Sequence, residues 1–293
     1  MPVTSVLERS REATWLVLTL AVVACFGLTL LDHAHLGTID PALDRLQTAT
    51  GGLVGPTLVF NLLKLAVVSL VIYGFGRLRP PDVGWHADAV GPALLIVVAF
   101  WIMMQGVLGL AAGLDDSALA WHKAWRRPGF VAGGLLGQFL GTALLEETLF
   151  RGFLLPQFYV KARRVCRPGL AMLFALLASQ GLFALFHIPS QVSKLNLTVT
   201  ELLVEQSGIF LMGLLFATLY IVTRNLFVGV GLHSLFNERA LVMQVPDTTA
   251  DPVLVGLTVM LLLSWPLARR FRARRGAPME PKRAGEAPAE RHS

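Results

Sequence analysis

The sequence predicts an all-α fold, a polytopic membrane protein built as a bundle of about eight transmembrane helices. Of its 293 residues, 54% are hydrophobic and only 15% are charged, whereas soluble domains carry about 25% charged residues. The apolar residues are gathered into eight runs, and a membrane-spanning helix needs about 20 such residues. We therefore expect one integral membrane domain over residues 1–271, with no soluble catalytic module attached.

The eight runs follow one another along the chain and are separated by short polar connections. Their approximate bounds are 14–31, 53–76, 90–113, 131–158, 169–187, 208–222, 226–243 and 253–268. The first run resembles a signal peptide, but the sequence Asp32-His33-Ala34-His35 that follows offers no small-residue cleavage site, so we expect a retained helix. Residues 272–293 lack an apolar pattern, and their composition predicts a disordered cytoplasmic tail.

Lys and Arg residues are distributed unevenly between the two sides that eight crossings define. If the termini lie in the cytoplasm, 17 of the 25 basic residues lie inside, six lie outside and two lie within runs. Cytoplasmic loops carry such an excess. The sequence therefore predicts a multi-pass cell-membrane protein with cytoplasmic termini, and its Arg- and Ala-rich composition indicates a bacterial source. The basic, aromatic stretch Trp121–Arg127 is the exception, and we expect it to lie on the membrane surface.

The isoelectric point near 9.8 does not indicate a nucleic-acid partner. The basic residues lie in loops and in the tail, so they form no basic stripe along one face. The expected partners are the lipid bilayer and a membrane-associated protein or peptide. Cys25 lies in the first run and Cys166 in a basic loop, so we expect no disulfide.

Two adjacent carboxylates, Glu146 and Glu147, interrupt the apolar run Gly133–Leu155, and Arg151 follows one helical turn later. Charged side chains inside a membrane segment are costly and are usually tied to function. On a helix Glu147 and Arg151 share a face and can pair, whereas Glu146 points about 100° away. The spacing predicts that Arg151 holds Glu147 and that Glu146 is free to act as a general base.

Two further polar pairs occur at helical spacing in later runs. Phe183 precedes His187 by four residues, and His233 precedes Asn237 by four. Each pair alone is typical of a helix end or of a hydrogen bond between neighbouring helices. Together with Glu146, the two histidines and the asparagine predict a site for water-activating chemistry inside the membrane.

This combination of residues suits two kinds of hydrolytic chemistry. In one, Glu146 and His187 activate a water molecule and pass its proton to a leaving amine, while His233 and Asn237 donate hydrogen bonds to the oxyanion. In the other, Glu146, His187 and His233 bind Zn²⁺ and leave one position open. The sequence contains no His-Glu-x-x-His and no Gly-x-Ser-x-Gly motif, so the commonest signatures of zinc proteases and serine hydrolases are missing.

At these residues the chain resembles the CAAX-protease and bacteriocin-processing family of intramembrane endopeptidases. The family motifs Glu-Glu-x-x-x-Arg, Phe-x-x-x-His and His-x-x-x-Asn match residues 146–151, 183–187 and 233–237, in order and on separate runs. The resemblance covers about residues 131–243. It implies an eight-helix bundle with a catalytic cavity in the membrane and a peptide bond as the target.

The resemblance implies one set of site residues: Glu146, His187, His233, Asn237, Glu147 and Arg151. In this set the first two residues activate water, the next two stabilise the oxyanion and the last two support the site. We expect the metal-free mechanism, with no cofactor, because it gives both His233 and Asn237 a use. Zn²⁺ bound by Glu146, His187 and His233 is the alternative.

Two other functions suit intramembrane Glu and His residues. A non-catalytic membrane scaffold or bacteriocin-immunity protein would keep the same fold, although the intact motif set argues against it. A proton-coupled transporter would also place such residues in the membrane, although the two halves of the chain show no repeat.

The depths of the three motifs impose a condition on the helices that carry them. If the fifth run starts at the membrane surface at Gly169, His187 lies about 27 Å along an ideal helix, whereas His233 lies about 10 Å along its own run. The side chains meet only if the fifth run begins outside the bilayer, tilts strongly, or is staggered against its neighbours.

Overall fold

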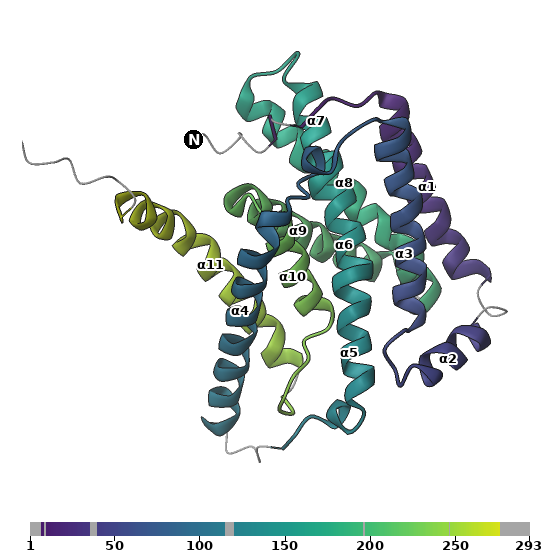
Figure 1. Cartoon of the computed structure of the whole chain (residues 1–293), viewed down its shortest axis with the longest axis vertical. Helices are drawn as coiled ribbons and strands as arrows, with labels where there is room; N and C mark the ends of the chain where they lie inside the picture. The colour runs from purple at the N-terminus through teal and green to yellow at the C-terminus, as the bar shows by residue number, and fades with distance from the viewer. Residues whose placement is uncertain are drawn as a thin grey trace, which may run out of the picture.

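The computed structural model describes residues 7–8, 10–35, 40–114, 120–195, 197–245 and 247–275 (Figure 1). Within these residues, all regular secondary structure is helical, apart from one isolated bridge. Seven helices in the described part are long and apolar enough to span a membrane, and a further apolar helix is shorter. The predicted all-α, polytopic bundle is confirmed. The predicted tail lies outside the described residues from position 276 onward.

The fourth crossing is one unbroken helix from Pro128 to Ala162, although its hydrogen-bonding pattern changes four times along its length. The π-helical segments are η3, η6 and η7, and the 3₁₀ segments are η4 and η5. In chain order the elements are α1 Trp15–His35, α2 Asp40–Ala49, α3 Pro56–Ser69, η3 Leu70–Phe75, η4 Pro80–Val83, α4 Ala87–Leu114, η5 Lys123–Arg126, α5 Pro128–Leu136, η6 Gly137–Thr142, α6 Ala143–Glu146, η7 Glu147–Leu154, α7 Leu155–Ala162, α8 Pro168–Leu195, α9 Val199–Thr223, α10 Leu226–Asn237 and α11 Asp247–Arg275.

Helix α9 is longer than the sixth predicted run, 208–222, and the predicted start is wrong. The helix begins at Val199, where the Thr198 hydroxyl accepts a hydrogen bond from the backbone N–H of Glu201 and the Glu201 side chain completes a capping box. Polar residues that a hydropathy pattern assigns to a loop therefore form the first turns of the helix. Helix α8 likewise extends beyond the predicted run 169–187.

The seventh predicted run consists of a short helix and a non-helical segment. Helix α10 ends at Asn237, and residues 238–245 continue without helical structure. Met243 in this segment pairs with Trp121. Non-helical backbone is tolerated at membrane depth only where protein or a cavity shelters its polar groups. The predicted run 226–243 is therefore helical only in its first part.

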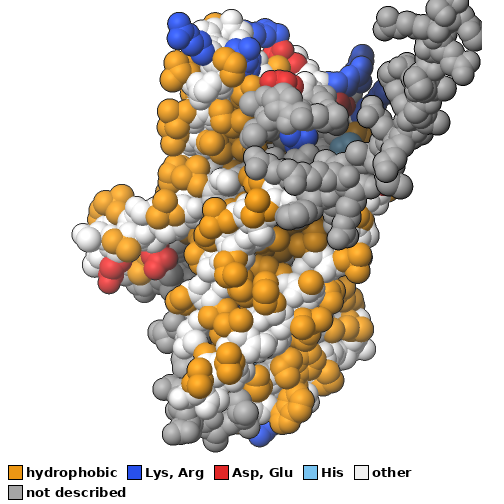
Figure 2. Space-filling model, turned by 90° about the vertical axis from the view of Figure 1, so that its left-hand side faces the viewer, with side chains coloured by type: hydrophobic (Ala, Val, Ile, Leu, Met, Phe, Trp, Pro, Cys, Tyr) orange, Lys and Arg blue, Asp and Glu red, His pale blue; other side chains and the backbone are white. Residues whose placement is uncertain are grey.

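The arrangement of the helices directs the start of α1 and the end of α11 towards the same end of the bundle. In Figure 1 this upper end holds α7 and the beginning of α1, and α11 rises towards it. Figure 2 shows hydrophobic side chains over the flank and Lys and Arg side chains gathered at the upper end. This distribution is the one expected of a membrane-spanning bundle with one basic end. The cytoplasmic position of that end stays a prediction.

Close packing positions the helix that carries the two glutamates. Glycines recur at every fourth residue on α5 and η6, namely Gly129, Gly133, Gly137 and Gly141. A Cβ atom on Gly133 would lie 1.9 Å from the backbone oxygen of Gly52, so a larger residue would force the chain apart. Small residues at this spacing are typical of closely packed transmembrane helices. Above them, Asn61 Nδ2 of α3 donates to Thr142 Oγ1 at 2.9 Å.

The chain before α1 is tied to α7 at the upper end of the bundle. Gln157 is fully buried, and its Oε1 accepts a hydrogen bond from the backbone N–H of Ala13 at 2.7 Å. Glu12 forms ion pairs with Lys161 at 3.0 Å and with Arg164 at 2.5 Å. The hydrogen bond from Lys161 holds the pKa of Glu12 below its ordinary value.

We expect this attachment to weaken in acid. Folding lowers the pKa of Glu12 below its ordinary value of 4.5. A carboxyl group of this kind stabilises the folded state at every pH above its ordinary pKa. The stabilisation is lost as the pH falls through the lowered pKa. The melting temperature in detergent should therefore fall more steeply below pH 4.5 for the wild type than for Glu12→Gln. Glu205→Gln, an exposed charge change on α9, should follow the wild-type profile. Identical acid profiles for the wild type and Glu12→Gln would contradict the role of Glu12.

Candidate active site

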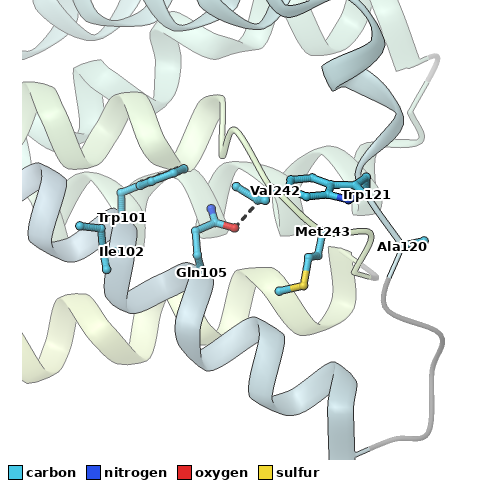
Figure 3. Close-up of a pocket in the computed structure, with 7 residues that line it drawn as sticks. All are labelled: Trp101, Ile102, Gln105, Ala120, Trp121, Val242 and Met243. Carbon is cyan, nitrogen blue, oxygen red and sulfur yellow. Dashed lines mark hydrogen bonds between the residues drawn. The ribbon is translucent and has the colours of Figure 1, made fainter.

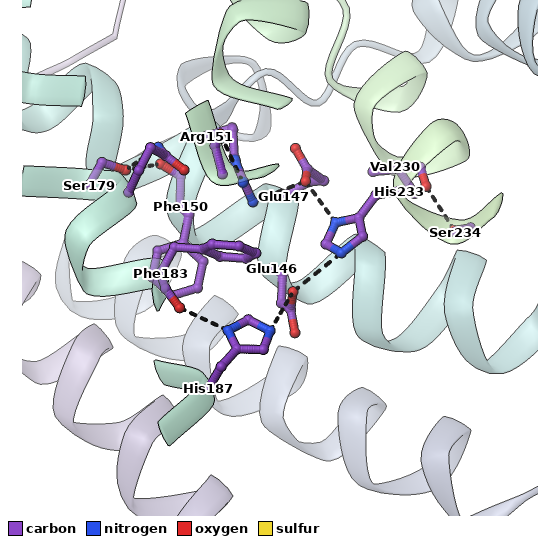
Figure 4. A network of polar contacts seen from close by, with 12 residues as sticks. Glu146, Glu147, Phe150, Arg151, Ser179, Phe183, His187, Val230, His233 and Ser234 are labelled. Atoms are coloured by element: carbon purple, nitrogen blue, oxygen red, sulfur yellow. Dashed lines mark hydrogen bonds and ion pairs between the residues drawn. The ribbon is translucent and has the colours of Figure 1, made fainter. Parts of the chain in front are cut away.

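Three segments of the chain bring the acidic and histidine residues together inside the bundle (Figure 4). Glu146 ends α6 and Glu147 begins η7, while His187 lies on α8 and His233 on α10. Oε2 of Glu146 lies 4.0 Å from Nε2 of His187 and 3.6 Å from Nε2 of His233. The two glutamates and His233 are buried, whereas 26% of the His187 side chain is exposed. The site is therefore enclosed, and His187 is the most exposed of these four residues.

The helices are staggered along the bundle, and this stagger removes the difference in depth that the sequence predicts between His187 and His233. From Glu146 the continuous helix runs 16 residues, or about 24 Å, to its end at Ala162, and His187 lies about 28 Å from the start of α8. Helix α10 begins deeper, because Leu226 lies beside Gly152, where a Cβ atom would be 3.5 Å from Leu226 Cδ2. His233, about 10 Å further along α10, therefore reaches the level of Glu146.

The helix around Glu146 has π-helical geometry on both sides. The four residues of α6 lie between η6 and η7, in which hydrogen bonds run from residue i to residue i+5. Such wide turns occur frequently at functional sites. Although they are adjacent in sequence, Glu146 and Glu147 both face His233 of α10, where they meet different nitrogens of the same ring (Figure 4).

Glu147 and Arg151 form a fully buried ion pair. Arg151 Nη1 lies 3.0 Å from Glu147 Oε1, and neither side chain is exposed to solvent. Arg151 Nη2 also donates to the backbone oxygen of Gly213 at 3.2 Å, and its guanidinium carbon lies 4.1 Å from the centre of the Phe183 ring. The predicted pairing of Glu147 with Arg151 is present in the structure, and it also connects α8 and α9 to the site.

Helix α10 approaches Glu147 closely because a glycine faces it. A Cβ atom on Gly229 would lie 3.0 Å from Glu147 Oε2. This close approach allows His233, one turn further along α10, to place Nδ1 2.9 Å from Glu147 Oε1. The side chain of Glu147 is thus enclosed between Arg151 on its own helix and α10.

The contacts of the two histidines determine which ring nitrogen carries a proton. His187 Nδ1 lies 2.8 Å from the backbone oxygen of Phe183, which only accepts hydrogen bonds, so Nδ1 is the donor. His233 Nδ1 likewise donates to Glu147 Oε1. Both Nε2 atoms are therefore directed towards Glu146 (Figure 4). This orientation leaves Glu146 Oε2 and the two Nε2 atoms available to a substrate or to water.

Aromatic rings form the walls around the histidines. Phe216 of α9 stacks on His233 with ring centres 4.7 Å apart and an angle of 18° between the planes, and Phe183 meets His187 edge-on at 4.7 Å. Sequence analysis identified Phe183 through its spacing but missed Phe216. An apolar residue within an apolar run carries no signal that distinguishes it from its lipid-facing neighbours.

Asn237 lies one turn beyond His233 and contacts a residue that sequence analysis missed. Asn237 Nδ2 donates to Gln138 Oε1 at 3.0 Å. Gln138 belongs to η6, and its polar amide within the run 131–158 is a signal that could have identified it. Asn237 is exposed, and so it lies at the edge of the buried cluster.

The chain after Asn237 is anchored at the lower end of the bundle. Gln105 Oε1 accepts a hydrogen bond from the backbone N–H of Val242 at 3.1 Å (Figure 3), and Trp125 Nε1 donates to the Leu241 oxygen at 2.8 Å. A mostly apolar pocket of about 330 Å³ lies beside this segment. Its lining residues are Trp101, Ile102, Gln105, Ala120, Trp121, Val242 and Met243. The pocket contains no predicted site residue, and its walls fix the end of α10.

The zinc alternative requires Glu146, His187 and His233 to share one metal position. Among the described residues, no group of three His, Cys, Asp or Glu side chains is placed to hold a metal ion. Zinc bonds of about 2.0–2.2 Å put tetrahedral ligands about 3.4 Å apart, and Glu146 lies 3.6 and 4.0 Å from the two histidines. The zinc alternative, with Glu146, His187 and His233 as ligands, stays a prediction. The expectation that no cofactor is needed stays a prediction.

Comparison with known families agrees with the motifs. Residues 128–238 match the family model described as Type II CAAX prenyl endopeptidase Rce1-like. This match confirms the resemblance to CAAX-type endopeptidases, and it covers α5 to the end of α10, including all six predicted site residues. The comparisons with curated proteins and with solved structures gave no match.

We expect the loss of Arg151 alone to destabilise the protein more than the loss of both charges of the buried ion pair. Arg151→Met should lower the free energy of unfolding by about 3–5 kcal/mol, because it leaves Glu147 as an unpaired buried charge. The double variant Glu147→Gln/Arg151→Met removes both charges, keeps an acceptor for His233 and should recover most of the loss. Chemical unfolding of the purified protein in detergent measures both values. A double variant as unstable as Arg151→Met would contradict the importance of the unpaired charge.

Proposed function

We propose that the protein is an intramembrane endopeptidase that hydrolyses a peptide bond in a membrane-associated protein or peptide by a metal-free mechanism. The observation that carries this proposal is the position of Glu146 Oε2, buried and facing Nε2 of His187 and of His233 at 4.0 and 3.6 Å. The match of residues 128–238 to a peptidase family supports it. The proposed setting is the cell membrane of a bacterium, with both termini in the cytoplasm.

Glu146 and His187 are placed to activate the attacking water. Glu146 Oε2 accepts no hydrogen bond from the described residues, and His187 Nε2 is an acceptor because Nδ1 carries the proton. A water molecule between these two atoms can donate one hydrogen bond to each. In this mechanism Glu146 then serves as the general base.

Charge balance supports a protonated His233. The carboxylates of Glu146 and Glu147 and the guanidinium of Arg151 together leave one negative charge in a buried site, which is unfavourable. A proton on His233 Nε2 restores neutrality, since the ring lies between both carboxylates. The resulting N–H is a donor for the oxyanion, and the amide of Asn237 supplies a second one.

The reaction then proceeds in two steps. The water oxygen bonds to the scissile carbonyl carbon while its proton passes to Glu146, and the carbonyl oxygen becomes an oxyanion that His233 and Asn237 stabilise. When the carbon–nitrogen bond breaks, Glu146 returns the proton to the leaving nitrogen. The products are a carboxylic acid and an amine, and the enzyme regains its starting protonation state. The acid then loses its proton to the amine or to water, which gives a carboxylate and an ammonium group.

The decisive test of the proposal is the loss of the general base. Purified protein in proteoliposomes is incubated with a peptide library derived from a proteome, and new termini are identified by mass spectrometry. Glu146→Gln should lower kcat on the best peptide by about 10²–10⁴-fold, whereas the control Glu205→Gln on α9 should match the wild type. Equal cleavage by Glu146→Gln and the wild type would contradict the proposal.

The same preparation distinguishes the rival functions. A scaffold or immunity protein would cleave no peptide and would keep its cellular phenotype in Glu146→Ala. A proton-coupled transporter would show a proton flux that depends on Glu146 but no new peptide termini. Either result would overturn the peptidase proposal.

Removal of metals tests the mechanism independently. We expect dialysis against a strong chelator to leave kcat unchanged, because no step assigned to the site residues requires a Lewis acid. Metal content is measured on the same sample by mass spectrometry. Stoichiometric zinc, loss of activity on chelation and recovery on zinc addition would together favour the zinc alternative.

A further inference from the structure

We propose that Gln138 is a positioning residue that holds the amide of Asn237 with its N–H groups, rather than its oxygen, available to the oxyanion. The inference rests on the proposed function, because it assigns a task to Gln138 within that reaction. It concerns a residue that matches none of the three motifs.

The first observation is the hydrogen bond itself. Gln138 Oε1 accepts from Asn237 Nδ2 at 3.0 Å, and this contact joins η6 to the end of α10. A primary amide within a membrane segment needs a partner, and contacts between helices commonly supply one. Gln138 is half-buried and Asn237 is exposed, so packing does little to fix the asparagine side chain.

The second observation is the position of Asn237 at the end of its helix. It is the last residue of α10, and Glu238 after it has extended backbone angles. The terminal torsion of asparagine has broad, roughly two-fold preferences, so its oxygen and nitrogen can exchange places by rotation. Gln138 presents Oε1 to Asn237 in the structure, and in this orientation it selects one of the two positions of the Asn237 amide.

The chemical consequence follows from the geometry of an amide. Nδ2 of Asn237 carries two hydrogens. When one is bonded to Gln138, the other is free to point to a developing oxyanion. If the amide turned over, the Asn237 oxygen would face the oxyanion and repel it. Gln138 therefore acts through Asn237 and has no contact with the substrate in this mechanism.

The test is a double-mutant cycle on cleavage of the best library peptide. Gln138→Met keeps the length of the side chain but removes the acceptor, and it should lower kcat about twofold to tenfold, the effect of one neutral hydrogen bond, with KM unchanged. In an Asn237→Ala background the same change should have no further effect. An unchanged kcat in the first case, or an equal loss in both backgrounds, would overturn the proposal.

A matched control separates positioning from stability. Asn61 on α3 also makes an amide hydrogen bond to η6, through Thr142, but this contact joins η6 to α3 and not to α10. Asn61→Leu should lower the melting temperature while leaving kcat per folded molecule unchanged. If Asn61→Leu lowers kcat as much as Gln138→Met does, then any loosened contact of this helix reduces activity, and the specific role of Gln138 fails.

The outcomes also separate this inference from the proposed function. If the wild type cleaves peptides, Glu146→Gln does not, and Gln138→Met behaves like the wild type, only the inference about Gln138 is wrong. If the wild type and all variants cleave nothing, the proposed function is wrong and the role of Gln138 falls with it.

Discussion

The ion pair between Glu147 and Arg151 is the contact on which the other parts of the site depend. Neither charge tolerates isolation inside the bundle, and their contacts reach three further helices. Arg151 lies over Phe183 of α8 and donates to Gly213 of α9, while Glu147 accepts a hydrogen bond from His233 of α10. A change in the position of any of these helices would therefore disturb a buried charge, and this constraint keeps the faces of the helices in register.

Unequal helix lengths make the convergence possible. Helices of equal length starting at one plane would place His187 and His233 at different depths, but α10 starts well below the end of α7 and finishes halfway through the bundle. A helix that ends there leaves its last carbonyl groups without partners in the helix, and Asn237 is exposed. Polar backbone of this kind is tolerated at membrane depth only next to a cavity or polar side chains. The early end of α10 therefore depends on the polar groups of the site.

The sequence predicted which residues gather at the site better than it predicted their geometry. Glu146, Glu147, Arg151, His187 and His233 were identifiable because charged and titratable residues are rare in apolar runs, and these five lie together in the structure. Phe216 and the stagger of the helices were not identifiable, because hydropathy reports neither which apolar face points inward nor where a helix starts relative to its neighbours. The first turns of α9 were missed for a related reason: capping by Thr198 and Glu201 allows a helix to begin in polar sequence.

The π-helical segments on either side of Glu146 affect how the chain length in this region can change. Each π-helical turn contains one residue more than an α-helical turn. Loss of a single residue from η6 or η7 converts that turn to ordinary α-helical geometry. The side chains of the helix beyond the turn keep their orientation. The helix that carries Glu146 can therefore absorb a one-residue deletion at two places, Gly137–Thr142 and Glu147–Leu154, provided that the deleted residue is not itself part of the site. Elsewhere along the same helix a deletion would rotate Glu146 away from both histidines.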